Sequence, residues 1–373
     1  PALHNEEAFC ESLLQAHLGL RPADLAMVNG GGCTETMVHG CSNVGSLDAG
    51  LNLPLVLEAS LRRLLPGASS FDAVLEGFLQ DLRQAIDGVT REVNADQEAK
   101  ARLRPQPMRT LLIDDCIDRG LEFNAGGARY NWSVINVAGL ANVADSLAAL
   151  RRVVFEQGVV SGAELLAAME ADFAGSEALR RRLEACPRYG NDDAAADALA
   201  ARVGEAVFRE LLDHAPWRGG RFLGSCLMFV TYALAGAAVG ATPDGRRRGR
   251  PLADSAGPMQ GRDRHGPTAM LKSVTALPHR LAPGTLVVNA RFAAELFDTA
   301  SSRDRLKALV RGYFDLGGMQ LQINVVDQEV LRRACEHPED YPDLVVRIGG
   351  YSEYFHRLSP ELRQSVLERT EHR

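Results

Sequence analysis

Long amphipathic segments alternate with short runs of β-branched and apolar residues along this chain, and that alternation restricts the fold more than any other feature. Apolar residues recur every three or four positions in the segments expected to be helices, namely 57–65, 71–86, 143–155, 163–183 and 194–214. Strand-like runs occupy 110–113, 286–290, 321–326 and 344–348. Such alternation favours an α/β architecture around an internal, largely parallel sheet. No Pro/Ser-rich linker divides the chain, so we expect one structural unit.

The composition is that of an ordinary globular protein with an acidic balance. The 373 residues include 41 Lys and Arg against 48 Asp and Glu, a formal net charge of −7. This balance excludes a disordered chain and argues against a nucleic-acid partner, because binding to phosphates needs a basic excess. The uncharged stretch 222–242 is broken by glycine and polar residues, so we expect a buried core segment there and no membrane partner.

Seven cysteines are scattered along the chain without any Cys-x-x-Cys spacing. An odd, dispersed set does not suit a disulfide framework or a zinc site. We therefore expect a reducing, cytoplasmic environment and no bound metal.

A triple glycine directly precedes one of these cysteines, in the sequence Gly30-Gly31-Gly32-Cys33-Thr34-Glu35. The glycines would give this thiol a narrow approach into a confined space, and Glu35 could move a proton in the same pocket. Three other interpretations stay open from these residues alone. They are a phosphate-binding glycine loop, a metal site formed by Cys33, His39 and Cys41, and a purely structural cysteine.

A second glycine pair lies near the carboxyl end, in Arg347-Ile348-Gly349-Gly350-Tyr351-Ser352. The pattern predicts a strand that ends in a glycine turn. It then predicts a helix from Pro360 to Arg369 with Ser359 as its N-cap. By itself this segment predicts no chemistry.

Taken together, the two glycine segments resemble the paired loops of the glycyl radical enzymes, the superfamily of pyruvate formate-lyase and the diol dehydratases. The likeness continues in order through the middle of the chain, in motifs that are long and unusual. They are NAGGARYNW at 124–132, DSLAA at 145–149, YGND at 189–192, ATPDGR at 241–246, and GRD to GPTA at 261–269 followed by Ser273-Val274. The resemblance therefore covers essentially the whole chain.

The resemblance implies a radical that is made from the chain itself, with no bound cofactor. In this family an activating enzyme uses S-adenosylmethionine and an iron–sulfur cluster to remove one hydrogen from a glycine in the carboxyl-terminal loop. The match places that radical on Gly350. Cys33 matches the residue that takes the radical next and abstracts a hydrogen from a small-molecule substrate. Glu35 matches the glutamate that acts as general base.

The residues around Cys33 point to the eliminating branch of the family, which includes dehydratases, carbon–nitrogen and carbon–sulfur lyases, and some decarboxylases. Pyruvate formate-lyase uses two adjacent cysteines, whereas Gly32 precedes Cys33 here. Where the diol dehydratases carry a His-Asp pair, this chain has Ser46-Leu47-Asp48, which does not support a diol substrate. Asp48 is the candidate to compensate, and Asp48, His39 and Cys41 are expected near the pocket.

Family members are about twice as long as this chain and form a ten-stranded α/β barrel that encloses both loops. The resemblance thus implies the carboxyl-terminal half of that barrel, with residues 1–240 in the barrel domain and 241–373 in a glycine radical domain. It also implies a missing amino-terminal half or companion subunit, an activating enzyme as partner, and a homodimer for the full enzyme. Two alternatives remain: acyl transfer of the formate acetyltransferase type, with Cys41 as second thiol, and a non-catalytic radical-bearing subunit.

Overall fold

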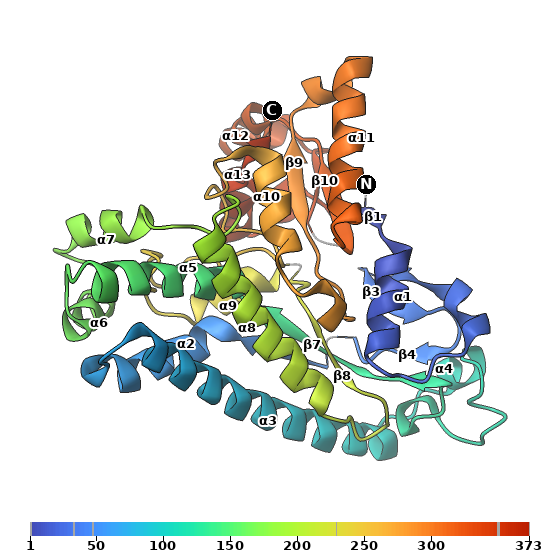
Figure 1. Ribbon diagram of the computed structural model, residues 1–373. Coiled ribbons are helices and arrows are strands. Elements are labelled where there is room, and N and C mark those ends of the chain that lie inside the picture. Colours follow the sequence, from blue (N-terminus) through green and yellow to red (C-terminus); the bar gives the residue numbers. More distant parts are fainter. Residues whose placement is uncertain (1, 33, 47, 229, 349–350, 373) are drawn as a thin grey trace.

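The computed structural model describes residues 2–32, 34–46, 48–228, 230–348 and 351–372 (Figure 1). Two residues central to the sequence analysis, Cys33 and Gly350, lie outside the described residues, as does Gly349. Their chain neighbours are described and define the segments that carry them.

A buried parallel sheet forms the first part of the architecture. Strand β7 (Ser133–Ala138) lies between β5 (Ala49–Asn52) and β8 (Phe222–Ser225), and both neighbours run parallel to it. All six residues of β7 are buried. A strand that is buried on both faces reads as a continuous apolar run, and β7 has no polar alternation to mark it as a strand in the sequence.

The sheet continues into the carboxyl-terminal part of the chain. Cys226, which follows β8, forms a parallel bridge with Leu286, three residues before β9 (Asn289–Phe292). Strand β9 pairs in parallel with β10 (Gln320–Asn324), and β1 (Ala2–His4) adds an antiparallel strand beside β10. The result is one curved wall in which β5, β7, β8, β9 and β10 all run in the same direction.

Helices cover this wall on its outer side. In Figure 1, α3 (Phe71–Leu103) runs along the edge of the molecule below β7 and β8, and α8 (Ala194–Asp213) crosses above it. Together with α2 (Leu53–Leu64) and α5 (Leu140–Leu150), they bury the largest hydrophobic core against the sheet. The helices form because their apolar residues recur on one face, and packing of that face stabilises them.

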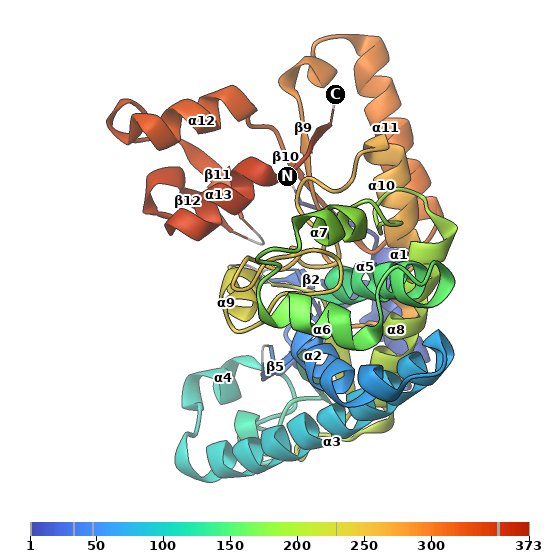
Figure 2. The same ribbon diagram turned by 90° about the vertical axis from the view of Figure 1, so that its left-hand side faces the viewer.

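The remaining elements connect and flank this frame. They are α1 (Glu6–Gln15), β2 (Val28–Gly31), β3 (Glu35–Val38), β4 (Ser42–Asn43), α4 (Pro107–Leu112), β6 (Tyr130–Asn131), α6 (Gly162–Glu170), α7 (Glu177–Glu184), α9 (Thr231–Ala237), α10 (Gly266–Thr275), α11 (Ala300–Asp315), α12 (Gln328–Glu336), β11 (Val345–Arg347), β12 (Ser352–Tyr354), α13 (Pro360–Glu368) and β13 (Glu371–His372). Figure 2 shows α12, β12 and α13 as a lobe at one side, and the buried apolar residues of this lobe share one cluster with Tyr232 of α9 and Ala138 of β7. Within the part of the chain that the structure describes, no helix has the length and apolar character to cross a membrane.

The α/β class is confirmed, and two details of the sequence reading are wrong. Of residues 110–113, expected as a strand, residues 110–112 form the end of helix α4, which begins at Pro107, and Ile113 is the extended residue that follows it. Proline at the first helical position favours a helix start, and this outweighed the β-branched Thr110. The single helix expected at 163–183 is two helices, α6 and α7, separated by a turn at Gly175.

No closed barrel occurs among the described strands, because none of them pairs with the outer edge of β5. The division at residue 240 stays a prediction. The N-cap at Ser359 is confirmed, since its side chain accepts a hydrogen bond of 3.3 Å from the backbone amide of Leu362.

Three of the motifs singled out in the sequence meet in one buried polar cluster. Arg188 lies 3.4 Å from a carboxylate oxygen of Asp145 and 3.5 Å from one of Asp244. Both carboxylates are fully buried, and the backbone amide of Tyr189 donates a 2.8 Å hydrogen bond to Asp145. Burial, together with the nearby charge of Asp244, raises the pKa of Asp145 to about 6. These motifs therefore join distant segments of the core and need no catalytic explanation.

Candidate functional site

The cysteine segment belongs to a β-hairpin. Strands β2 and β3 pair antiparallel from Val28 opposite Val38 to Gly31 opposite Glu35. The amide of Thr34 donates a 2.8 Å hydrogen bond to the carbonyl of Gly31 and closes the turn. Gly32 has φ +54° and Thr34 has φ +97°. Glycine adopts such values freely, but a β-branched residue does so only when its surroundings hold it there.

Glu35 lies buried beside this turn, with only 6% of its surface exposed. A Cβ on Gly32 would lie 3.1 Å from Oε2 of Glu35, so the absence of a side chain at position 32 leaves room for the carboxylate. The hydroxyl of Ser46 donates a hydrogen bond to Oε1 of Glu35. The carboxylate is therefore held next to Gly32, the residue that precedes Cys33 in the chain.

A threonine from a distant segment fastens the hairpin to the wall. The hydroxyl of Thr285 donates a 2.9 Å hydrogen bond to the carbonyl oxygen of Thr34 and lies 2.9 Å from the hydroxyl of Thr36. All three threonines are buried. Thr285 itself has φ +94°, so two strained threonines face each other at the turn.

The carboxyl-terminal glycine segment is a second hairpin. Strands β11 and β12 pair antiparallel, ending with Arg347 opposite Ser352. The amide of Ile348 donates a 3.0 Å hydrogen bond to the carbonyl of Tyr351, across the two glycines of the sequence. Ile348 is fully buried, which anchors the first strand of the hairpin in the core.

Buried polar groups hold the base of this second hairpin. Nη2 of Arg369 lies 2.7 Å from Asp254 and 3.4 Å from the carbonyl oxygen of Ile348. Asn289 donates a 2.9 Å hydrogen bond to the same Asp254 carboxylate. Gln322 in turn donates to the side-chain oxygen of Asn289 at 2.6 Å and to the carbonyl of Ile348 at 3.5 Å. Charged hydrogen bonds in a buried setting are strong and directional, so they restrict where the hairpin can lie.

Both hairpins are thus attached to one stretch of the wall, residues 285–289. The cysteine hairpin is bonded to Thr285, and the glycine hairpin is bonded through the network that includes Asn289. Four residues of extended chain span at most about 14 Å. Segments more than 300 positions apart in the sequence therefore meet at the same part of the sheet.

The three further pocket candidates lie in different surroundings. Asp48 borders a cavity, but its carboxylate already pairs with Arg218 at 2.7 Å and accepts hydrogen bonds from Ser133 at 2.7 Å and Gln97 at 2.9 Å. His39 is exposed just beyond the Val28–Val38 end of the first hairpin, at least about 10 Å along the strands from Glu35.

Cys41 is fully buried near the same end of the hairpin. Arg129 lies 3.2 Å from its sulfur, and the thiol donates a 3.6 Å hydrogen bond to Asp114. Burial raises the pKa of this thiol despite the nearby arginine, which makes it a weaker nucleophile. The structure therefore brings Glu35 and Ser46 together but not His39 or Cys41 with them.

Sequence reasoning missed the residues that position the two hairpins. Thr285, Asp254 and Arg369 are buried polar residues in segments without an unusual local pattern. Their role depends on contacts with residues 21 to 251 positions away, and no short motif carries that information.

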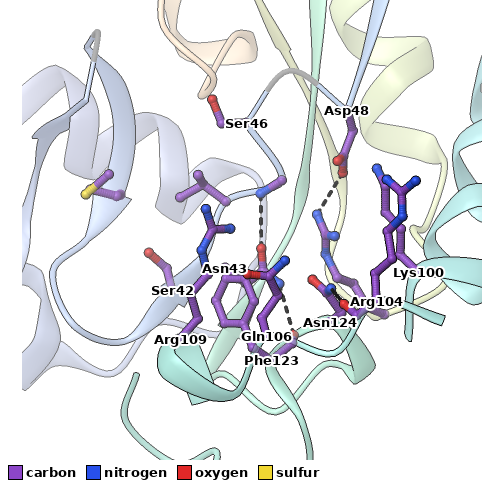
Figure 3. A pocket seen from close by; sticks show the side chains of 14 residues that line it. Ser42, Asn43, Ser46, Asp48, Lys100, Arg104, Gln106, Arg109, Phe123 and Asn124 are labelled. Carbon is purple, nitrogen blue, oxygen red and sulfur yellow. Dashed lines mark hydrogen bonds and ion pairs between the residues drawn. The ribbon is translucent and has the colours of Figure 1, made fainter. Parts of the chain in front are cut away.

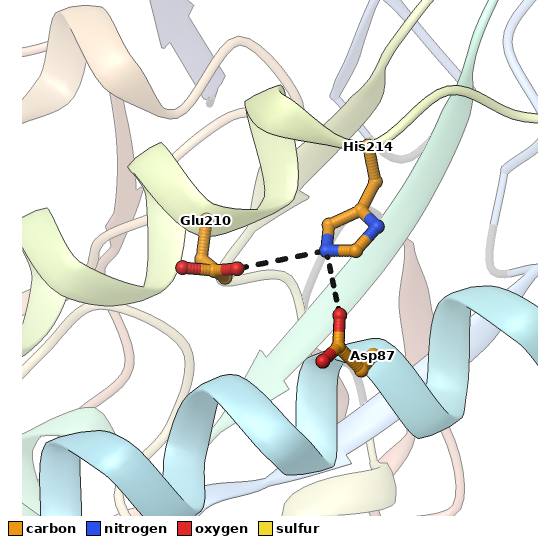
Figure 4. A group of neighbouring side chains, drawn as sticks. All are labelled: Asp87, Glu210 and His214. Carbon is orange, nitrogen blue, oxygen red and sulfur yellow. Dashed lines mark ion pairs between the residues drawn. The ribbon is translucent and has the colours of Figure 1, made fainter.

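One cluster elsewhere has side chains that metals accept. Figure 4 shows His214 at the end of α8 between Asp87 of α3 and Glu210 of α8. Nε2 of His214 lies 3.2 Å from Asp87 and 3.6 Å from Glu210. Arg83 also approaches Glu210, at 3.8 Å. These half-buried ion pairs join α3 to α8.

An α/β wall that carries a cysteine hairpin and a double-glycine hairpin on one stretch defines a class of protein, and comparison with known proteins identifies it. A family model described as pyruvate formate lyase-like matches residues 1–236, and one described as glycine radical matches residues 252–356. The chain belongs to the glycyl radical enzyme family.

Relatives with described activities match along this chain. The trans-4-hydroxy-L-proline dehydratase of Clostridioides difficile is 33% identical over all of this chain and 48% of its own length. The isethionate sulfite-lyase of Desulfovibrio desulfuricans is 35% identical over 71% of this chain and 32% of its own length. The glycerol-bound B12-independent glycerol dehydratase of Clostridium butyricum superposes with a TM-score of 0.96 at 31% identity, covering all of this chain and 49% of that one. The chain spans about half the length of the relatives that match it end to end.

Proposed function

We propose that this chain is the catalytic, carboxyl-terminal half of a glycyl radical lyase. An activating enzyme that uses S-adenosylmethionine and an iron–sulfur cluster would remove a hydrogen atom from Gly350. Cys33 would then give its hydrogen atom to Gly350 and become a thiyl radical. The observation that carries this proposal is the attachment of both hairpins to residues 285–289, because radical transfer between them requires proximity.

In the chemical step, the Cys33 thiyl takes a hydrogen atom from a carbon of the substrate. Glu35 accepts a proton from the hydroxyl on that carbon, and the neighbouring bond breaks with the electron pair leaving on the departing group. The product radical then takes the hydrogen atom back from the Cys33 thiol. The burial of Glu35 and its contact with Ser46, beside Gly32, support this role.

Elimination is preferred to acyl transfer because of the surroundings of the cysteines. Gly32 occupies the position where an adjacent thiol would be needed. Cys41 is buried, pairs with Asp114 and Arg129, and lies near the other end of the hairpin. The dehydratase, sulfite-lyase and decarboxylase names of the relatives support the same branch.

The whole protein would contain a second half that completes a ten-stranded barrel around the two hairpins and dimerises as a full enzyme. The outer edge of β5 has no partner among the described strands, and an apolar groove that includes Leu51, Met228 and Leu234 runs beside it. An open, apolar sheet edge is a site of association. The half-length match to the relatives supports the same conclusion.

Electron paramagnetic resonance after anaerobic activation tests the radical assignment. We expect a doublet in the intact protein that is lost in Gly350→Ala and kept in the matched control Gly312→Ala, whose added methyl meets open space. Cys33→Ala should keep the doublet but lose turnover, whereas Cys10→Ala should keep both. A doublet that survives in Gly350→Ala, or turnover that survives in Cys33→Ala, would contradict the proposal.

The role of Glu35 has a separate test. Glu35→Gln keeps the size of the side chain and can still accept a hydrogen bond from Ser46, so we expect a full radical signal with turnover reduced at least 100-fold. Ser46→Ala removes only the contact that orients the carboxylate and should lose less activity. Normal turnover in Glu35→Gln would remove the proton-transfer step from the mechanism.

A further inference from the structure

A cavity of about 460 Å³ lies between the segment that follows the first hairpin and the carboxyl-terminal end of α3 (Figure 3). Ser46, the partner of Glu35, lines the cavity on one side, and Arg109 of α4 lines it on the opposite side. None of the catalytic steps described above uses this cavity. Its lining raises a separate question about what it binds.

The lining is strongly basic in a protein of net charge −7. Lys100, Arg104, Arg109 and Arg218 line the cavity together with a single carboxylate, that of Asp48. Lys100 pairs with Asp96 outside the lining, and Arg218 pairs with Asp48. Within the described ranges, Arg104 and Arg109 form no ion pair with a carboxylate, and the guanidinium of Arg109 lies over the ring of Phe123, 5.4 Å from its centre. Two guanidinium groups thus remain available at the cavity.

The acidic groups near the cavity are already engaged. Asp48 is held by Arg218, Ser133 and Gln97 on the wall. The carboxylate of Glu122, behind α4, accepts hydrogen bonds from the backbone amides of Gln106 and Asn124. Neither carboxylate offsets the charge of the two free guanidinium groups by a direct pair.

Arg218 is the buried member of the lining. Its side chain is only 5% exposed, and its Nη2 lies 2.7 Å from the Asp48 carboxylate and 2.9 Å from the carbonyl oxygen of Trp132. The charge of Arg218 is therefore balanced within the wall. The cations that line the cavity without a carboxylate partner among the described residues are Arg104 and Arg109.

We propose that this cavity binds a small oxyanion group, such as a phosphate, sulfonate or carboxylate, through Arg104 and Arg109. Planar guanidinium groups bind oxyanions with paired, charge-assisted hydrogen bonds. The contact between Ser46 and Glu35 places the cavity beside the candidate base. If the oxyanion is part of the substrate, that assignment rests on the function proposed above; the binding site itself does not.

Calorimetric titration of inorganic phosphate into the intact, unactivated protein at low salt tests the site without any radical chemistry. We expect binding in the millimolar range or tighter, weakened at least tenfold in Arg104→Gln/Arg109→Gln. The control Arg91→Gln/Arg305→Gln removes the same charge at two exposed positions outside the cavity and should bind like the natural protein. Arg104→Lys/Arg109→Lys should recover part of the affinity, because charge returns without the planar fork.

Equal affinity in the two glutamine double variants, or no binding by the natural protein below about 10 mM, would overturn the proposal. A second measurement identifies the source of the oxyanion once a substrate is in hand. Phosphate that raises KM at constant kcat in the activated enzyme would place the anionic group on the substrate. Phosphate that binds and leaves KM unchanged would mark a separate site for a free anion. A failure of activation affects only this second measurement.

Discussion

Replacement of Thr285 tests whether the cysteine hairpin is held against the wall in the way the structure indicates. The Thr285 hydroxyl contacts two buried oxygens, the carbonyl of Thr34 and the hydroxyl of Thr36, both at 2.9 Å. Removing one partner from a buried hydrogen bond costs about 1–3 kcal/mol. We therefore expect Thr285→Ala to weaken attachment of the hairpin by about 2 kcal/mol, the lower end of the sum for two contacts.

Two matched variants separate the hydroxyl from the backbone. Thr285→Ser keeps the hydroxyl and should cost less than about 1 kcal/mol. Thr285→Gly loses the hydroxyl but relieves a backbone at φ +94°, where strain is worth about 1–3 kcal/mol and the added flexibility of glycine costs about 0.5–1 kcal/mol. Glycine should therefore be about 1 kcal/mol less destabilising than alanine, although it is the smaller residue.

Native-state hydrogen exchange of peptides that cover residues 34–38 measures this attachment locally. A loss of 2 kcal/mol corresponds to exchange that is about 30-fold faster, whereas peptides of α3 should be unchanged and serve as the internal control. Among the three variants, we expect exchange to be slowest in Thr285→Ser, faster in Thr285→Gly and fastest in Thr285→Ala. Equal exchange rates in the alanine and serine variants would refute the role of the hydroxyl. Slower exchange in the alanine variant than in the glycine variant would refute the backbone strain at position 285.

Three further predictions concern the frame around the hairpins. Burial raises the pKa of Asp197 from 3.8 to about 6, so ionisation of this carboxyl opposes folding. The natural protein should therefore lose about 1–3 kcal/mol of stability as the pH rises from 4 to 7. In urea titrations across that range, the stability of Asp197→Asn should depend less on pH. Gly45→Ala would place a methyl against Arg218, at φ +54° in the lining of the cavity, and should lower the melting temperature by several degrees and weaken phosphate binding. Gly67→Ala, in open space, should do neither. Arg369→Met leaves the Asp254 carboxylate buried without its charged partner, which should cost about 3–5 kcal/mol of stability and reduce the radical yield detected by EPR. The double variant Arg369→Met/Asp254→Asn should recover part of that stability. If the double variant recovers none, the two side chains act independently.

The helices that could be predicted are those with a strong local signal. The apolar periodicity of α3 and α8 is local, and so is the capping serine of α13. The strands of the wall were harder to predict from the sequence. The strand β7 is buried on both faces and short, so its sequence lacks the alternation that marks a strand, and α4 shows that a proline can turn a β-branched run into a helix.

The candidate catalytic residues Cys33, Glu35 and Gly350 stood out in the sequence, because a glycine run beside a thiol or a carboxylate is a rare pattern that can be recognised without any knowledge of the fold. The residues that hold these candidates in place did not stand out in the sequence. Thr285 meets Thr34 across 251 positions, and a contact of that length is decided by how the parallel wall folds back on itself. The same holds for the basic cavity, which the chain assembles from four separate segments. Local composition can specify which groups react, but only packing of the whole sheet determines which distant groups hold them in place.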